Sequence, residues 1–261
     1  MTLRNLTGFL SALLIAGGAL AGQSCEPRQP KPAEIRAGLE LAQKVHLHLE
    51  ANGARAAVIA RVGRDLSEYG LRYSHIGLAL RDGERRRWRV LHLLNHCGRA
   101  DSDLYEQGLG NFFLDDLFRF EALVLLPSVE LQARLVEAVA QGAARGLHQP
   151  AYSLIAHPYS ARYQNSNQWL LELVASAAAG TGSGRAAAQA QLARTDFEPS
   201  VLYLPPLRRL GARLFSVNTQ FDDHSMEEWS SSRYKIVSAE SVLSYLGRID
   251  RTMGQSVLVV P

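Results

Sequence analysis

Apolar residues return at helical spacing in some parts of the chain and at strand spacing in others. At 33–51 they recur every three or four residues, which predicts a helix that ends at Asn52-Gly53. Runs rich in branched and aromatic side chains predict strands at 56–62, 73–80, 88–94 and 120–126. We therefore expect a helix followed by a mostly antiparallel sheet.

The second half of the chain is predicted to be mainly helical. One or two helical turns are expected at 111–118, and helices at 128–146, 166–177 and 186–193. Shorter elements are expected at 233–237 and 238–246, with a last strand at 257–260. A glycine-rich break at 180–184 separates a core domain, 22–179, from a C-terminal extension, 180–261. The predicted fold class is α+β, an antiparallel sheet with packed helices.

The first 21 residues resemble a secretory signal. Arg4 precedes an apolar stretch at 8–20, and Ala19-Leu20-Ala21 has the small residues that signal peptidase recognises. About 13 apolar residues are too few for the roughly 20 that cross a bilayer. Lipid attachment at Cys25 is less favoured, because Gly22-Gln23-Ser24 before it lacks the aliphatic residue of a lipid-attachment site. We expect a periplasmic or secreted protein without a transmembrane segment after signal removal.

Export changes the interpretation of the two cysteines. Cys25 and Cys97 would be an even pair in an oxidising compartment, which favours a disulfide between them. The alternatives are two free thiols, or Cys97 as a nucleophile beside His96. The sequence does not decide between them.

Charge and motif content argue against several functions. The net charge of +3 over 261 residues is small, and the run 85–87 of arginines is expected at a solvated hairpin tip, so no nucleic-acid partner is expected. The segment 222–228 holds Asp, His and Glu, but without a second ligand set it is expected to be a solvated acidic loop and not a metal site. No glycine-rich phosphate loop occurs, and no cofactor is expected.

Two strand histidines are the first candidate for chemistry. Side chains alternate along a strand, and a hairpin turn at Asp82-Gly83 would place His75 opposite Val90, whereas a turn one residue later would place it opposite His92. Both registers put the two imidazoles on one face of the sheet. One imidazole can then act as a base while the other orients it. The alternative is that each histidine only bonds a neighbouring carbonyl.

Ser166 is the second candidate. Asn165 and Gln168 form an Asn-x-x-Gln capping box, so Ser166 is expected in the first turn of a helix. Free N–H groups and the helix dipole favour negative charge there. The alternative is that Ser166 belongs only to the helix cap.

These motifs resemble the permuted papain-like enzymes, the group of lecithin retinol acyltransferase and permuted cell-wall peptidases. The resemblance lies in His75-Ile76-Gly77, in 90–93 and in 165–170, within a region from Val58 to Val174. It implies a circularly permuted papain-like fold with Ser166 as nucleophile, His75 as base and His92 as the orienting group. The whole chain resembles an uncharacterised family of exported bacterial proteins, number 2145 among the domains of unknown function, which supplies no activity.

The resemblance implies an envelope hydrolase or acyltransferase that acts on an amide or ester of a small molecule, peptide or lipid. The family pattern has a cysteine where this chain has Ser166. An imidazole can ionise a thiol, but a hydroxyl needs concerted base catalysis and a formed oxyanion hole. The alternative is a catalytically inactive papain-like binding protein of the cell envelope.

Overall fold

The computed structural model describes residues 29–83, 87–180 and 184–260. Its main sheet has six strands, in the order β4-β3-β2-β1-β5-β8, and every neighbouring pair is antiparallel. The strands of this sheet are β1 (Ala56–Val62), β2 (His75–Asp82), β3 (Arg87–Asn95), β4 (Ser102–Gly108), β5 (Arg119–Leu126) and β8 (Gly254–Val259). A second, two-stranded sheet pairs β6 (Ser200–Tyr203) with β7 (Arg233–Ile236).

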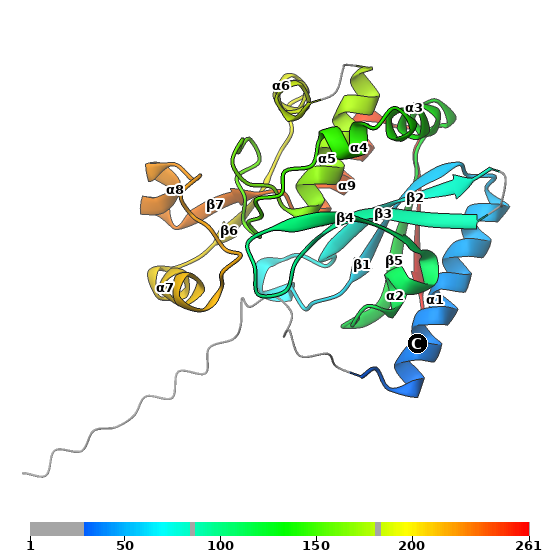
Figure 1. Cartoon of the computed structure of the whole chain (residues 1–261), viewed down its shortest axis with the longest axis horizontal. Coiled ribbons are helices and arrows are strands. Elements are labelled where there is room, and N and C mark those ends of the chain that lie inside the picture. Colours follow the sequence, from blue (N-terminus) through cyan, green and yellow to red (C-terminus); the bar gives the residue numbers. More distant parts are fainter. Residues whose placement is uncertain (1–28, 84–86, 181–183, 261) are drawn as a thin grey trace, which may run out of the picture.

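The helices pack on both faces of the main sheet (Figure 1). They are α1 (Pro32–Ala51), α2 (Leu109–Leu114), α3 (Val129–Ala140), α4 (Ala143–Gly146), α5 (Ser166–Ala179), α6 (Arg185–Arg194), α7 (Pro206–Phe215), α8 (Met226–Ser231) and α9 (Ala239–Ile249), with a 3-10 turn, η1 (Ser67–Tyr69). The mixed fold with an antiparallel sheet and packed helices confirms the predicted α+β class in this coarse form.

Alternation along the strands separates two hydrophobic cores. On β1, Val58 and Ala60 belong to the core shared with α3, α5 and α9, whereas Ala57 and Ile59 belong to the core shared with α1 and α2. All seven residues of β1 are buried, because helices cover the strand on both sides. The two faces of the main sheet therefore pack against different helices. Candidate residues can contact each other only where they lie on the same face.

The C-terminal residues contribute to two parts of the fold. Strands β6 and β7, with α7 and α8, enclose a small third core that includes Leu204, Phe221 and Tyr234. The final strand β8 pairs with β5 at the edge of the main sheet. The predicted boundary at residue 180 stays a prediction, although the last strand completes the same sheet as the first.

Several predictions concern residues that the structure does not describe. The expected signal, 1–21, lies outside the described residues, as does Cys25, so export and the bridge from Cys25 to Cys97 stay predictions. Most of the arginine run at 85–87 also lies outside them. Across the described ranges, no helix is both long enough and apolar enough to cross a bilayer.

Candidate functional site

The two strand histidines meet. His75 Nε2 lies 2.9 Å from His92 Nδ1, and both side chains are buried. The prediction of adjacent antiparallel strands with both imidazoles on one face is confirmed. Both predicted registers are wrong, because Leu78 pairs with Leu91 and the shift brings Gly77 next to His92. The shared face survives, since a shift by an even number of residues keeps side chains on the same side.

An aromatic ring and a buried cation complete the surroundings of the histidine pair. The Phe112 ring on α2 lies 5.9 Å from the His75 ring and 5.3 Å from the His92 ring, between ring centroids. Gly77 allows this approach, because a Cβ there would lie 2.7 Å from Val90 and 3.2 Å from Phe112. Arg61, opposite His75 in the β1–β2 register, places its guanidinium 4.6 Å from the centre of the Phe112 ring.

Arg61 is the residue that sequence reasoning missed. Its side chain is buried and bonds the Phe112 carbonyl oxygen and the Asp115 carboxylate. Its Nε has no hydrogen-bond partner among the described residues. A buried arginine is costly unless it is well paired, so it is more often functional or part of a network than incidental. The available signal was a single charged residue inside an otherwise apolar strand.

The histidine pair is held in its neutral state. Burial lowers the pKa of His75 well below its usual value, and the nearby charges of Arg61 and His92 lower it further. Burial, followed by the charge of Arg61, lowers the pKa of His92 to about 4. Both rings are therefore uncharged near neutral pH.

Hydrogen bonding restricts which nitrogen of each ring is available. Since Nε2 of His75 is engaged with His92, Nδ1 is the nitrogen left for another group. The outer nitrogen of His92, Nε2, is buried without a hydrogen-bond partner among the described residues. Gln107 lies near the His92 ring and acts against the lowering of its pKa.

Ser166 opens α5, as predicted. The Asn165 side chain accepts a hydrogen bond from the Gln168 backbone N–H at 2.8 Å and donates to the carbonyl oxygens of Leu154 and Val237. Burial raises the pKa of the Tyr152 hydroxyl, and hydrogen bonds with the side chain and backbone N–H of Ser166 act against that rise. The described partner of Ser166 is thus a tyrosine.

The structure does not bring Ser166 into contact with the histidine pair. Helix α5 packs on the face of the sheet that carries Ile76 and Leu78, whereas His75 and His92 point to the opposite face, toward Phe112. Within the described part of the chain, Ser166 forms no hydrogen bond with either histidine. The three residues approach the same region from two sides of the sheet.

One cavity of about 310 Å³ is lined by both His75 and Ser166. Arg61, His75, Tyr152 and Ser166 are among its polar lining residues. Its apolar wall includes Leu66, Leu71, Leu154, Leu202, Ile236 and Val237. This volume lies at the lower end of the range of about 300–1,000 Å³ for small-molecule sites.

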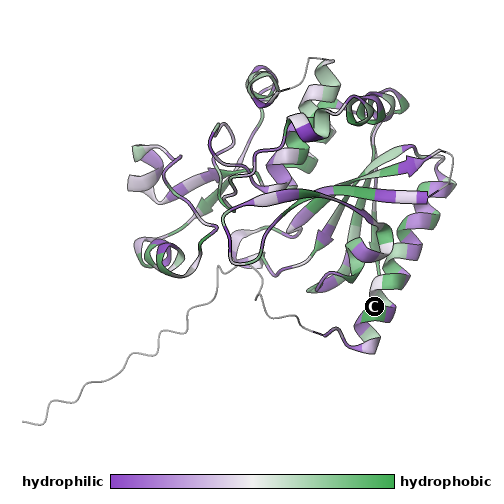
Figure 2. Ribbon diagram, in the orientation of Figure 1, coloured by the Kyte–Doolittle hydropathy of each residue, from purple (hydrophilic) through white to green (hydrophobic). Residues whose placement is uncertain are grey.

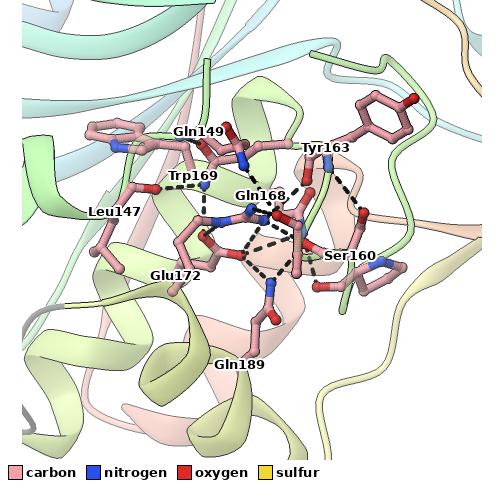
Figure 3. A network of polar contacts seen from close by, with 12 residues as sticks. Leu147, Gln149, Ser160, Tyr163, Gln168, Trp169, Glu172 and Gln189 are labelled. Atoms are coloured by element: carbon pink, nitrogen blue, oxygen red, sulfur yellow. Dashed lines mark hydrogen bonds and ion pairs between the residues drawn. The ribbon is translucent and has the colours of Figure 1, made fainter. Parts of the chain in front are cut away.

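A buried polar network holds the Ser166 helix against the preceding loop. Glu172 on α5 is fully buried and accepts hydrogen bonds from Arg185 at 2.9 and 3.0 Å, from Gln189 at 3.0 Å and from Gln164 at 2.7 Å (Figure 3). Arg185 also donates to the carbonyl oxygens of Ser160 and Tyr163. The network therefore fixes the segment that leads into Ser166.

The acidic segment 222–228 differs from its prediction. His224 is buried and its Nε2 bonds the Ile155 carbonyl oxygen at 2.8 Å, and Glu228 is buried and accepts hydrogen bonds from the backbone N–H groups of Ser225 and Lys235. The expectation of a solvated loop is thus wrong for His224 and Glu228, whose side chains satisfy backbone groups beside the small C-terminal core, whereas Asp222 and Glu227 are exposed. No group of His, Cys, Asp and Glu in the described ranges has the arrangement to hold a metal ion.

Fold and site together define a mixed α/β protein with a neutral, buried histidine pair, in which His75 lines one cavity with Ser166, the first residue of α5. The chain belongs to a bacterial family: the model for an uncharacterized protein conserved in bacteria (DUF2145) matches residues 48–246. No curated protein and no solved structure matches the chain.

Proposed function

We propose that this chain is a catalytically inactive binding protein of the bacterial cell envelope. It derives from a permuted papain-like hydrolase and holds a small ligand in the cavity between His75 and Ser166. The observation that carries the proposal is the placement of the histidine pair on the face of the sheet away from α5.

The lack of a base placed to take the Ser166 proton, among the described residues, supports this proposal over hydrolysis. A general base must lie within hydrogen-bond reach of the proton that it removes, and His75 forms no such contact with Ser166 in the described structure. Protonation of His75 is also unfavourable, because burial and the charge of Arg61 lower its pKa. A serine has a much weaker tendency to ionise than a cysteine and needs that base more.

The cavity lining indicates the kind of ligand. Apolar side chains such as Leu154 and Leu202 form one wall, and the hydroxyls of Tyr152 and Ser166 belong to the polar part. Small-molecule sites combine a mostly apolar lining with a few polar groups that set orientation. The fitting ligand has an apolar body and one polar, hydrogen-bonding end.

Binding can be measured with the neutral fluorophore N-phenyl-1-naphthylamine. We expect saturable binding at one site, and we expect Leu154→Gln to weaken it about tenfold, since a polar amide replaces an apolar contact. Val201→Gln is the matched control, because Leu154 is 37% exposed and Val201 is 44% exposed on β6 and lies outside this cavity. Equal affinities of the two variants would contradict the proposal.

The second candidate is the serine hydrolase or acyltransferase, which one observation favours: Ser166 and His75 line the same cavity. Ser166→Cys separates the two candidates. For a binding protein, we expect iodoacetamide to alkylate the introduced thiol at a rate that His75→Ala changes by less than about twofold, because no contact links the two positions. Peptide mapping would follow that thiol apart from the native cysteines.

The opposite outcome would favour the hydrolase. The introduced thiol could have a pKa clearly below the free value of about 8.5, and His75→Ala could return that pKa to the free value. This result would show that the two residues work together. Circular dichroism of both variants would show that they are folded. That result would replace the binding protein with the hydrolase as the proposed function.

A further inference from the structure

Helix α7 presents its apolar side to solvent. Leu207, Leu210 and Leu214 are 83%, 54% and 66% exposed, and their spacing of three and four residues places them on one face. Ala212, on the other side of the helix, is buried. A surface helix normally turns its apolar stripe toward the core, so α7 is oriented in the reverse sense.

The polar side of α7 holds the helix on the small C-terminal core. Arg209 donates to the Trp229 carbonyl oxygen and to the Tyr234 hydroxyl, both at 2.7 Å. Arg213 lies 5.9 Å from the centre of the Trp229 ring. Because these arginines make the inward contacts, the leucines are left outside. Helix α7 lies at the end of the molecule away from α1 and α2 (Figure 1), and it carries both hydrophilic and hydrophobic residues (Figure 2).

Charge on α7 has one sign. The helix contains three arginines, at 208, 209 and 213, and no acidic residue. Arginines beside an exposed leucine stripe, with the half-buried Trp229 beneath, match the composition of helices that lie in a membrane interface. Ten residues span about 15 Å, which is too short to cross a bilayer.

We infer that α7 binds flat on the surface of an anionic phospholipid bilayer, with Leu207, Leu210 and Leu214 in the interfacial region. Charge complementarity favours anionic phospholipid over a protein partner, because Arg209 and Arg213 contact only neutral groups among the described residues, so their charge still attracts an anionic surface. The inference is independent of the ligand-binding proposal.

This surface adjoins the candidate site. Arg208 on α7 donates to the Glu68 carboxylate at 2.8 Å and to the Tyr69 hydroxyl at 3.2 Å, and both partners line the cavity. A bilayer beneath α7 would therefore lie beside the loop that borders the cavity.

Co-sedimentation with vesicles tests the inference. The chain from Gly22 onward, the expected mature form, would be mixed with vesicles of phosphatidylglycerol and phosphatidylcholine in equal parts, and with pure phosphatidylcholine vesicles. We expect binding to the mixed vesicles only. The double variant Leu207→Gln/Leu214→Gln should lose about tenfold or more in partitioning, because its apolar contacts with the interface are gone.

The matched control removes equally exposed apolar side chains elsewhere. Leu47 on α1 is 59% exposed and Val129 on α3 is 79% exposed, and the Leu47→Gln/Val129→Gln variant should bind like the wild type. Equal binding by the leucine variant would overturn the inference, as would failure to bind the mixed vesicles. Sedimentation velocity showing a dimer that the same leucines stabilise would also overturn it, in favour of a second copy of the chain.

Discussion

Arg185→Met is expected to lower the free energy of unfolding by about 3–5 kcal/mol, the cost of leaving a buried charge without its partner. The Arg185 side chain is 12% exposed and its partner Glu172 is fully buried. Burial raises the pKa of Glu172, and the hydrogen bonds and charge of Arg185 oppose that rise. Without the guanidinium, Glu172 must either stay charged in the interior or take up a proton. Urea denaturation near neutral pH would measure the loss.

Arg134→Met is the control for this experiment. Arg134 pairs with Glu130 one turn away on α3, with side chains 44% and 75% exposed, and such pairs contribute about 0.5 kcal/mol or less. Adding Glu172→Gln to Arg185→Met should recover part of the lost stability, because the unpaired charge is removed. A loss for Arg185→Met as small as that for Arg134→Met would show that the network in Figure 3 does not stabilise the fold.

Elements with strong local patterns could be predicted from the sequence, whereas β4, β6, α7 and α8 could not. Strand β4 (Ser102–Gly108) was missed because it is an edge strand with acidic and polar residues, which lack the apolar alternation of a covered strand. Helix α7 was missed because Pro205 directly precedes it and it holds Pro206 and Gly211, residue types that usually interrupt helices. Proline is favourable in the first turn of a helix, where its missing N–H costs nothing.

Part of the candidate site could likewise be predicted from the sequence, and part of it could not. The shared face of His75 and His92 follows from the parity of residues on paired strands, so it survived a wrong hairpin register. The start of the helix at Ser166 follows from the capping box of Asn165 and Gln168. Which face of the sheet α5 covers depends on packing between distant segments, and no local pattern encodes it. The burial of Arg61 between β1 and α2 is a tertiary feature of the same kind.

Acidification from about pH 7 to about pH 4 is expected to cost about 2–3 kcal/mol of stability through His92. Its pKa is about 4 in the folded protein, against about 6.5 for an unperturbed histidine, because burial disfavours the charged ring. Between these values the unfolded chain binds the proton and the folded chain does not. Stability therefore falls as pH decreases through this window, and the contribution levels off below about pH 4. His75 adds to the effect in the same direction, since its pKa is lowered too.

Urea denaturation of the wild type and His92→Gln across this range would isolate the contribution. Carboxylates titrate there as well, but they are common to both proteins, so the difference in slope reports the histidine.

The charge of Arg61 also affects this loss of stability, because it opposes protonation of both histidine rings. Asp115→Asn removes the carboxylate that pairs with Arg61 and should steepen the loss, since His92 then lacks a nearby negative charge that favours its protonated form. Identical slopes in the wild type and His92→Gln would mean that the ring takes up its proton in the folded state as readily as in the unfolded chain. The assignment of His75 and His92 as a neutral, buried pair, which supports the binding proposal, would then be wrong.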